Sequence, residues 1–318
     1  MKSVAHRPRG PAGNHKHDNQ GVRPVTSTNP KVSVVLATYG REEVLCETIR
    51  QVLSEPYANK ELVVIDQTPE HTPETQNYLE SVRSEIRYIP MDHPNLTEAE
   101  NLGIRTASGD ILLFVDDDVV FEPGLIDAHL GNYVDETVTG VAGLVLERGR
   151  MPLQRMPGVC RSMRFGFFFF RHDYARRVVV PNVPEGNMSF RRQALLDVGL
   201  IDERFRENAY LWGMDLAVRV AKQGGRIVHD PTAWLRHLRH ASGGIRMKAV
   251  RPVSYFRNLF YFLKKHATRH ETLSVALRVY FYRVLVEGWR RPWVIPVNTR
   301  TFAKAWWIEQ HPDGGETT

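Results

Sequence analysis

Short apolar runs alternate with stretches of helical apolar spacing over the first third of the chain. The runs have the length and composition of strands buried on both faces, and they cover residues 32–36, 62–65 and 111–115. The stretches between them predict amphipathic helices over residues 44–53, 73–84 and 95–106. This alternation predicts an α/β fold, Rossmann-like, in which helices flank a mostly parallel sheet.

Weaker patterns extend the predicted sheet. Three further strands are expected at residues 86–89, 141–145 and 225–228. Turn-forming residues fill 184–188, and Asp230 with Pro231 predicts a turn that ends the last of these strands.

The two ends of the chain differ from this α/β domain, which we bound at residues 31–245. Residues 1–30 hold almost no large apolar side chain and therefore predict a disordered basic tail. Residues 246–318 predict a helical extension, rich in aromatic and basic residues, whose pattern is broken at Pro292 and Pro296. Such helices suit either peripheral contact with an anionic membrane or packing against the domain with their cations solvated.

The formal net charge of +6 is unevenly distributed. Residues 32–235 hold 21 Lys or Arg against 30 Asp or Glu, whereas residues 236–318 hold 15 against five. An acidic centre without a nucleic-acid motif argues against a nucleic-acid partner. Cys46 and Cys160 cannot form a disulfide framework, no apolar run is long enough to cross a membrane, and no signal peptide is evident. We therefore expect a cytoplasmic protein, with any membrane contact peripheral and at the inner face.

Three consecutive carboxylates, Asp116, Asp117 and Asp118, follow the apolar run at 111–115. Extended geometry would point Asp116 and Asp118 to one side and Asp117 to the other. The carboxyl ends of strands are where open α/β sheets bind ligands. Adjacent carboxylates repel one another, and a divalent cation such as Mg²⁺ or Mn²⁺ would remove that cost. The alternative is a strand that ends in a solvated acidic turn.

Other polar residues fall at strand ends of the same predicted sheet. Thr38 opens a loop, residues 37–41, that carries a hydroxyl, an aromatic ring, a glycine and a cation, and Asp66 ends the second strand. Because parallel strands end at one edge of the sheet, both should converge with Asp116 and Asp118 on one crevice.

This series of pieces resembles a family 2 glycosyltransferase of the GT-A fold. The matching pieces, which occur in the family's order, are residues 32–39, 63–66, 100–104, 116–118 and 186–192. The resemblance covers about residues 31–245, leaving the helical extension outside it. It implies an enzyme that transfers a sugar from a nucleotide diphosphosugar and inverts the anomeric centre. The acceptor, whether a glycan, a lipid-linked compound or a small molecule, stays open.

The resemblance also implies roles for individual residues. The nucleotide sugar would be held by Thr38, Asp66, Asp116 and Asp117. The cation, Mn²⁺ or Mg²⁺, would be held by Asp118 and His237, and it would neutralise charge on the leaving nucleoside diphosphate. By residue type alone, Asp66 also suits a turn-forming acid, and His237 a surface residue.

The acceptor side is less well marked. Glu185 and Asn187 lie in or beside the piece that resembles the family's acceptor-side loop, and we assign them there. The aromatic run at 165–170 suits an acceptor pocket, a lipid-facing surface or the core.

The likeness fails where the catalytic base is expected. Family members usually carry an acid two or three places before an Asp-Leu pair; here that pair begins at Asp215, and residues 212–214 hold no acid. An inverting displacement needs a base at the acceptor hydroxyl, so we assign Asp215, with Glu207 and Glu185 in reserve. Asp215 equally suits pairing with Arg219 one helical turn later. Without a base, the chain would be a catalytically impaired GT-A-fold protein that binds nucleotide sugars.

Overall fold

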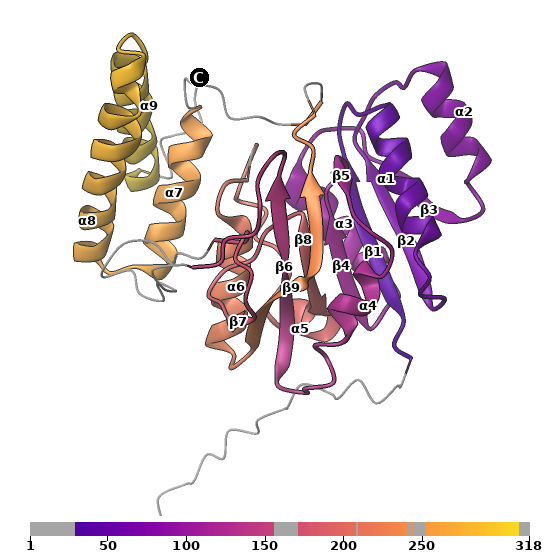
Figure 1. The fold of residues 1–318 in the computed structure, drawn as a ribbon. Coiled ribbons are helices and arrows are strands. Elements are labelled where there is room, and N and C mark those ends of the chain that lie inside the picture. Colours follow the sequence, from indigo (N-terminus) through magenta and orange to yellow (C-terminus); the bar gives the residue numbers. More distant parts are fainter. Residues whose placement is uncertain (1–28, 156–170, 208, 241–242, 245–251, 312–318) are drawn as a thin grey trace, which may run out of the picture.

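The computed structural model describes residues 29–155, 171–207, 209–240, 243–244 and 252–311. The aromatic run at 165–170 and nearly all of the predicted N-terminal tail lie outside the described residues. Within them, one mixed sheet of nine strands is flanked by helices, with three further helices standing beside it (Figure 1). The predicted α/β architecture is confirmed.

The first half of the sheet is parallel, in the order β3-β2-β1-β4. Its strands are β1 (Val32–Thr38), β2 (Lys60–Asp66), β3 (Ile86–Pro90) and β4 (Ile111–Val115). The helices between them are α1 (Glu43–Ser54), α2 (Pro73–Ser81) and α3 (Leu96–Thr106). Side chains cap two of the helix starts: Thr72 accepts the amide of Thr75, and Asn95 accepts that of Glu98. All seven elements were predicted, with bounds that differ by three residues or fewer.

The second half of the sheet is mixed. Its elements in chain order are β5 (Val119–Val120), α4 (Leu125–Leu130), β6 (Val138–Glu147), β7 (Val178–Val179), β8 (Asn187–Arg191), α5 (Arg192–Asp197), α6 (Trp212–Lys222) and β9 (Arg226–His237). Strand β8 is antiparallel to both β4 and β6, between which it lies. The turn expected over 184–188 therefore ends sooner than predicted, because all five residues of β8 are buried in the sheet.

The turn expected at Asp230 and Pro231 does not end the last strand. Strand β9 continues to His237 and shifts register against β6, so that Gly143 pairs with Asp230 but Leu144 pairs with Trp234. Pro231, which lacks an N–H, falls inside this irregularity, where it costs the ladder no hydrogen bond. The longer strand brings His237 opposite Val119, directly after the acidic triplet.

The helical extension consists of α7 (Val253–His266), α8 (Arg269–Val279), a π-helical segment Tyr280–Val286, a 3-10 turn Gly288–Arg290 and α9 (Val294–Gln310). Helix α7 packs back on the α/β domain, where Tyr255, Phe256 and Leu259 join one core with Phe205 and Trp212. In the described residues no helix is both long enough and apolar enough to span a bilayer.

One prediction for this extension was wrong. Pro296 does not break a helix, because it lies in the first turn of α9, where its missing N–H has no partner to lose. Leu273, Leu277 and Phe281 follow helical spacing and are 54%, 61% and 62% exposed, which contradicts neither alternative for these helices.

Candidate active site

A pocket of about 630 Å³ opens at the carboxyl ends of β1 and β4. Its lining includes six of the nine residues predicted for the site: Thr38, Asp116, Asp117, Asp118, Glu185 and His237. These residues come from β1, from the segment after β4, from the loop before β8 and from the end of β9. Asp66, Asn187 and Asp215 do not line it.

The acidic triplet divides as strand alternation predicts. Asp116 and Asp118 face His237, and one ligand atom from each of the three residues lies within 4.8 Å of the others. His237 Nε2 is 2.9 Å from Asp118 Oδ1 and 3.6 Å from Asp116 Oδ2. The hydrogen bond that His237 donates to Asp118 raises the pKa of His237. Two carboxylates and an imidazole suit a borderline-hard divalent cation such as Mn²⁺.

The exposure of the three side chains fits a cation that also meets a substrate. Asp118 is 2% exposed and Asp116 is 48% exposed, with His237 between them at 27%. A cation held here would have protein ligands on one side and the pocket on the other, as sites that share substrate phosphates require. The residues present therefore fit a divalent cation.

Asp117 points away from this cluster and binds Arg41. Its carboxylate accepts hydrogen bonds from Arg41 Nε at 3.1 Å and from Thr38 Oγ1 at 2.7 Å. Arg41 Nη2 also reaches Asp118 Oδ2 at 3.0 Å. Burial raises the pKa of Asp117 to about 6, against the opposing charge of Arg41. The buried guanidinium thus offsets part of the repulsion within the triplet.

The carboxyl group of Glu185 lies against Gly213, within the stretch 212–214 that lacks the expected acid in the sequence. Its Oε1 accepts the backbone N–H of Gly213 at 3.1 Å, and a Cβ added to Gly213 would lie 2.8 Å from Glu185 Cγ. The glycine therefore leaves the space that the Glu185 side chain occupies. Burial, and then the charge of Asp116, raise the pKa of Glu185 to about 7. A carboxyl group with that pKa can take up a proton near neutral pH.

A second glycine allows the loop of Glu185 to approach the triplet. A Cβ added to Gly186 would lie 2.0 Å from Asp116 Oδ2, a distance at which no side chain fits. Close approach of this backbone therefore requires glycine at 186.

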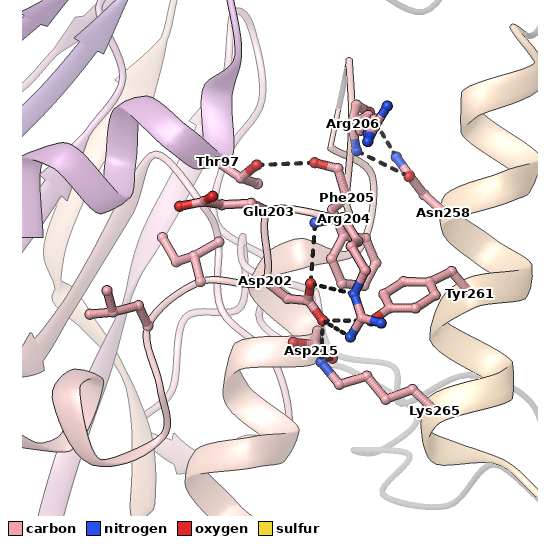
Figure 2. A network of polar contacts seen from close by, with 12 residues as sticks. Thr97, Asp202, Glu203, Arg204, Phe205, Arg206, Asp215, Asn258, Tyr261 and Lys265 are labelled. Atoms are coloured by element: carbon pink, nitrogen blue, oxygen red, sulfur yellow. Dashed lines mark hydrogen bonds and ion pairs between the residues drawn. The ribbon is translucent and has the colours of Figure 1, made fainter. Parts of the chain in front are cut away.

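Asp215, which the sequence analysis assigned as the base, does not line the pocket. Asp215 is 0% exposed and lies outside the pocket, at the contact between α6 and α7 (Figure 2). Its Oδ1 meets Lys265 Nζ and His266 Nε2, each at 2.7 Å, and its Oδ2 meets Arg219 Nε at 2.7 Å. These partners lower the pKa of Asp215 despite its burial. The pairing with Arg219, the alternative interpretation, is confirmed.

Asp66 and Asn187 are also held away from the pocket. The Asp66 carboxylate accepts hydrogen bonds from His71 Nε2 at 2.7 Å and from the Tyr88 hydroxyl at 3.0 Å. The Asn187 side chain bonds His129 Nε2 at 2.9 Å through its oxygen and donates to the Leu144 and Ala233 carbonyls. The side chain of Asn187, which the sequence analysis assigned to the acceptor side, is fully buried, and its polar atoms are all used within the sheet.

Comparison with known proteins agrees with this geometry. The family model described as glycosyl transferase family 2 matches residues 33–199, more than half of the chain. The chain belongs to this family. This family 2 glycosyltransferase is 26% identical over 204 residues to an uncharacterised glycosyltransferase of Bacillus subtilis. The aligned region covers 60% of this chain and 68% of the relative.

A second relative and a solved structure extend the comparison. The family 2 enzyme is 25% identical over 224 residues to the glucosyl-dolichyl phosphate glucuronosyltransferase of Haloferax volcanii, covering 65% of this chain and 69% of the relative. The mannosyltransferase of Pyrobaculum calidifontis, solved with GDP-Man and Mn²⁺, superimposes with a TM-score of 0.53 at 16% identity over 90% of this chain and 78% of its own. At that identity the likeness shows the GT-A fold.

Several pocket residues of the glycosyltransferase were not singled out from the sequence. Arg41 had been noted only as the cation of its loop, and Tyr39, Gln67 and Tyr210 had no assigned role. For Arg41 and Tyr39 a signal existed, since both directly follow Thr38 at a strand end. Gln67 carried the same signal, because it follows Asp66 at the end of β2, whereas Tyr210 carried none.

Glu100 was seen in the sequence only as part of a motif. It is buried on α3, its Oε2 has no hydrogen-bond partner in the described part of the chain, and burial beside Asp116 and Glu185 raises its pKa well above the ordinary value. A raised pKa favours the neutral form of this carboxyl group, which adds no charge to the carboxylates of the pocket.

Proposed function

We propose that this glycosyltransferase moves a sugar from a nucleotide diphosphosugar to an acceptor hydroxyl with inversion, and that Glu185 is the catalytic base. The observation that carries the proposal is the pairing, in one pocket, of the Asp116, Asp118 and His237 cluster with the Glu185 carboxyl above Gly213. The first supports binding of a cation with a diphosphate, and the second supports removal of a proton from an acceptor.

The donor would be bound in two parts. Asp116, Asp118 and His237 would hold Mn²⁺ or Mg²⁺, which when bound supplies positive charge to the leaving diphosphate. The nucleoside would lie along Thr38 and Tyr39, where the tyrosine ring offers a stacking surface for the base. Asp66 would act indirectly, since its Oδ1 accepts the amide of Thr68 at 2.8 Å and thereby fixes the turn that carries Gln67 to the pocket.

The displacement itself would use this chain's own carboxylate. The acceptor oxygen attacks the anomeric carbon from the face opposite the phosphate, and the bond from that carbon to the phosphate oxygen breaks. Glu185 takes the acceptor proton as the new bond forms, and the nucleoside diphosphate leaves with the electron pair. The hypothesis of a catalytically impaired binding protein rested on the missing acid. The carboxyl group of Glu185, which lies beside Gly213, would take the place of that acid.

The acceptor would be a compound that presents a hydroxyl group to Glu185. A glycan, a lipid-linked compound or a small molecule would each present a hydroxyl, and a role in cell-envelope or polysaccharide synthesis in the cytoplasm would suit all three. A first screen would incubate the protein with Mn²⁺ and a panel of nucleotide sugars and measure released nucleoside diphosphate, with and without candidate acceptors.

The base assignment is tested by moving the acid. Glu185→Gln should lower turnover by about 10²–10⁴-fold, the usual contribution of a positioned base, and leave Mn²⁺-dependent binding of a nucleoside diphosphate intact. The double variant Glu185→Gly with Gly213→Glu returns a carboxylate to the same space from α6 and should recover part of the loss. Glu207→Gln is the matched control, because Glu207 also lines the pocket but is bonded to Ser254 Oγ. Transfer by Glu185→Gln at the rate of the unaltered enzyme would exclude Glu185 as the base.

A further inference from the structure

The turn that leads into α9 exposes two tryptophans. Trp289 is 83% exposed and Trp293 is 70% exposed, and Val286 and Val297 beside them are 43% and 40% exposed. We call residues 286–297 the tip. Indole rings this exposed are costly in water, and they favour the interfacial zone of a bilayer, where the ring meets acyl chains and its N–H meets headgroups.

The tip is a tight, closed turn. The amide of Arg291 donates to the Gly288 carbonyl at 2.8 Å, and that of Val294 donates to the Arg291 carbonyl at 3.0 Å. A Cβ added to Gly288 would lie 2.6 Å from Ile295 Cγ1, so the two sides of the turn are in close contact. Val294 is 5% exposed and anchors the tip from within. The tryptophans therefore project from a fixed frame rather than from a loose loop.

The charge of the tip and of its helices is positive. Arg290 and Arg291 are exposed between the two tryptophans, and neither has a carboxylate within ion-pair distance among the described residues. Arg283, in the π-helical segment before the tip, is by contrast paired with Glu287. From Arg269 to His311 the chain holds seven Lys or Arg against three Glu. Cations beside interfacial aromatic rings match the phosphates of anionic lipids.

We propose that the tip docks this enzyme on an anionic membrane surface, with Trp289 and Trp293 at the interface and Arg290 and Arg291 on lipid phosphates. A second copy of the chain is the less suitable occupant, because two tips of the same positive charge repel one another.

The position of the tip gives the docking a direction. In Figure 1 the turn leading into α9 lies at the upper end of the molecule, as does the end of β9, which carries His237 into the pocket. Docking through the tip would thus bring the pocket end toward the membrane. Resting on the proposed function, this favours a lipid-linked acceptor over a free one.

The test is flotation of the full chain with vesicles. Binding is expected to vesicles of phosphatidylcholine mixed with phosphatidylglycerol, to be weak with phosphatidylcholine alone, and to fall as salt rises. Arg290→Glu with Arg291→Glu should weaken binding at least about tenfold, since each basic residue near an anionic surface contributes about fivefold. Trp289→Ala with Trp293→Ala should also weaken it about tenfold or more, because two indole rings leave the interface.

Two matched controls keep the test decisive. Trp307→Ala removes a 51% exposed tryptophan elsewhere on α9, and Lys304→Glu reverses an exposed charge on the same helix. Both should bind vesicles within about threefold of the unaltered protein, and all variants should retain Mn²⁺-dependent binding of a nucleoside diphosphate, which separates this proposal from the proposed function. Equal vesicle binding by the tip variants and the controls would overturn it. The proposal would also be overturned if the unaltered protein did not bind vesicles but self-associated in sedimentation velocity, and if the tip variants abolished that self-association.

Discussion

The carboxylates of Asp116 and Asp118 and those of Asp202 and Asp215 lie in contrasting surroundings. Those at the pocket meet one imidazole and one guanidinium, and Asp116 is 48% exposed. Asp202 and Asp215 are almost wholly enclosed between α6 and α7, where Lys265 bridges them at 2.8 and 2.7 Å (Figure 2). We call the first group the pocket cluster and the second the buried pair.

The contrast separates carboxylates that serve a ligand from those that serve the fold. The buried pair has its cations built in, from Arg204, Arg219, Lys265 and His266, and its pKa values are lowered. The pocket cluster has fewer cations: burial raises the pKa of Asp116, although the hydrogen bond with His237 lowers the pKa of Asp118. A group of acids that the protein does not fully neutralise has room for positive charge from outside.

The largest effect is expected at the pocket. Asp118→Ala should abolish Mn²⁺-dependent binding of a nucleoside diphosphate and lower turnover by about 10³-fold or more, because a diphosphate would meet carboxylates without the cation between them. Isothermal titration with the diphosphate, with and without Mn²⁺, measures the first effect. Asp92→Ala, at a 95% exposed side chain outside the pocket, is the control. Unchanged Mn²⁺-dependent affinity in Asp118→Ala would remove the pocket cluster as the cation site.

The buried pair should respond in the opposite way. Asp215→Asn leaves Lys265, His266 and Arg219 without their shared carboxylate and should lower the free energy of unfolding by about 3–5 kcal/mol. Protein that remains folded should bind the nucleoside diphosphate normally and retain turnover, because Asp215 does not line the pocket. Urea unfolding together with a turnover assay distinguishes the two effects. A stable variant with little turnover would return Asp215 to a catalytic role.

Acid should weaken the buried pair. The folded-state pKa values of Asp202 and Asp215 are lower than their ordinary values of about 4. Their stabilisation is thus fully present above about pH 4 and is lost as the pH falls through the folded-state values. The free energy of unfolding should decline from about pH 4 downward, and more gently in Asp202→Asn. Urea titrations over this range measure both slopes, and parallel slopes would contradict the assignment.

The smallest effect is expected at the rim of the buried pair. Arg204 bonds Asp202 at 3.2 Å, but its side chain is 69% exposed, so water and salt screen the pair. Arg204→Ala should cost about 1 kcal/mol or less. Lys265→Met, inside the same network, should cost more. Urea unfolding of the two variants side by side ranks them, and a larger loss for Arg204→Ala would show that exposure is not what separates them.

Local pattern was sufficient for the parallel half of the sheet and for the division of the triplet. The apolar run before Asp116 and the two-residue period of a strand are properties of neighbouring residues. Local pattern was insufficient to place Asp215, because its partners Lys265 and His266 lie about fifty positions further along the chain. Glu185 was predicted as an acceptor-side acid, but its position against Gly213 depends on the packing of the loop before β8 against α6. The spacing of residues along the sequence does not show such tertiary contacts.

The core shared by α7 and the α/β domain also sets how far this enzyme can be trimmed. The family match ends at residue 199, yet Tyr255 and Phe256 of α7 are 2% and 0% exposed against the domain. Lys265 and His266 complete the buried pair from the same helix. A fragment that stops before α7 would therefore expose an aromatic face and leave two buried carboxylates without Lys265 and His266. The smallest fragment suited to independent production reaches at least His266.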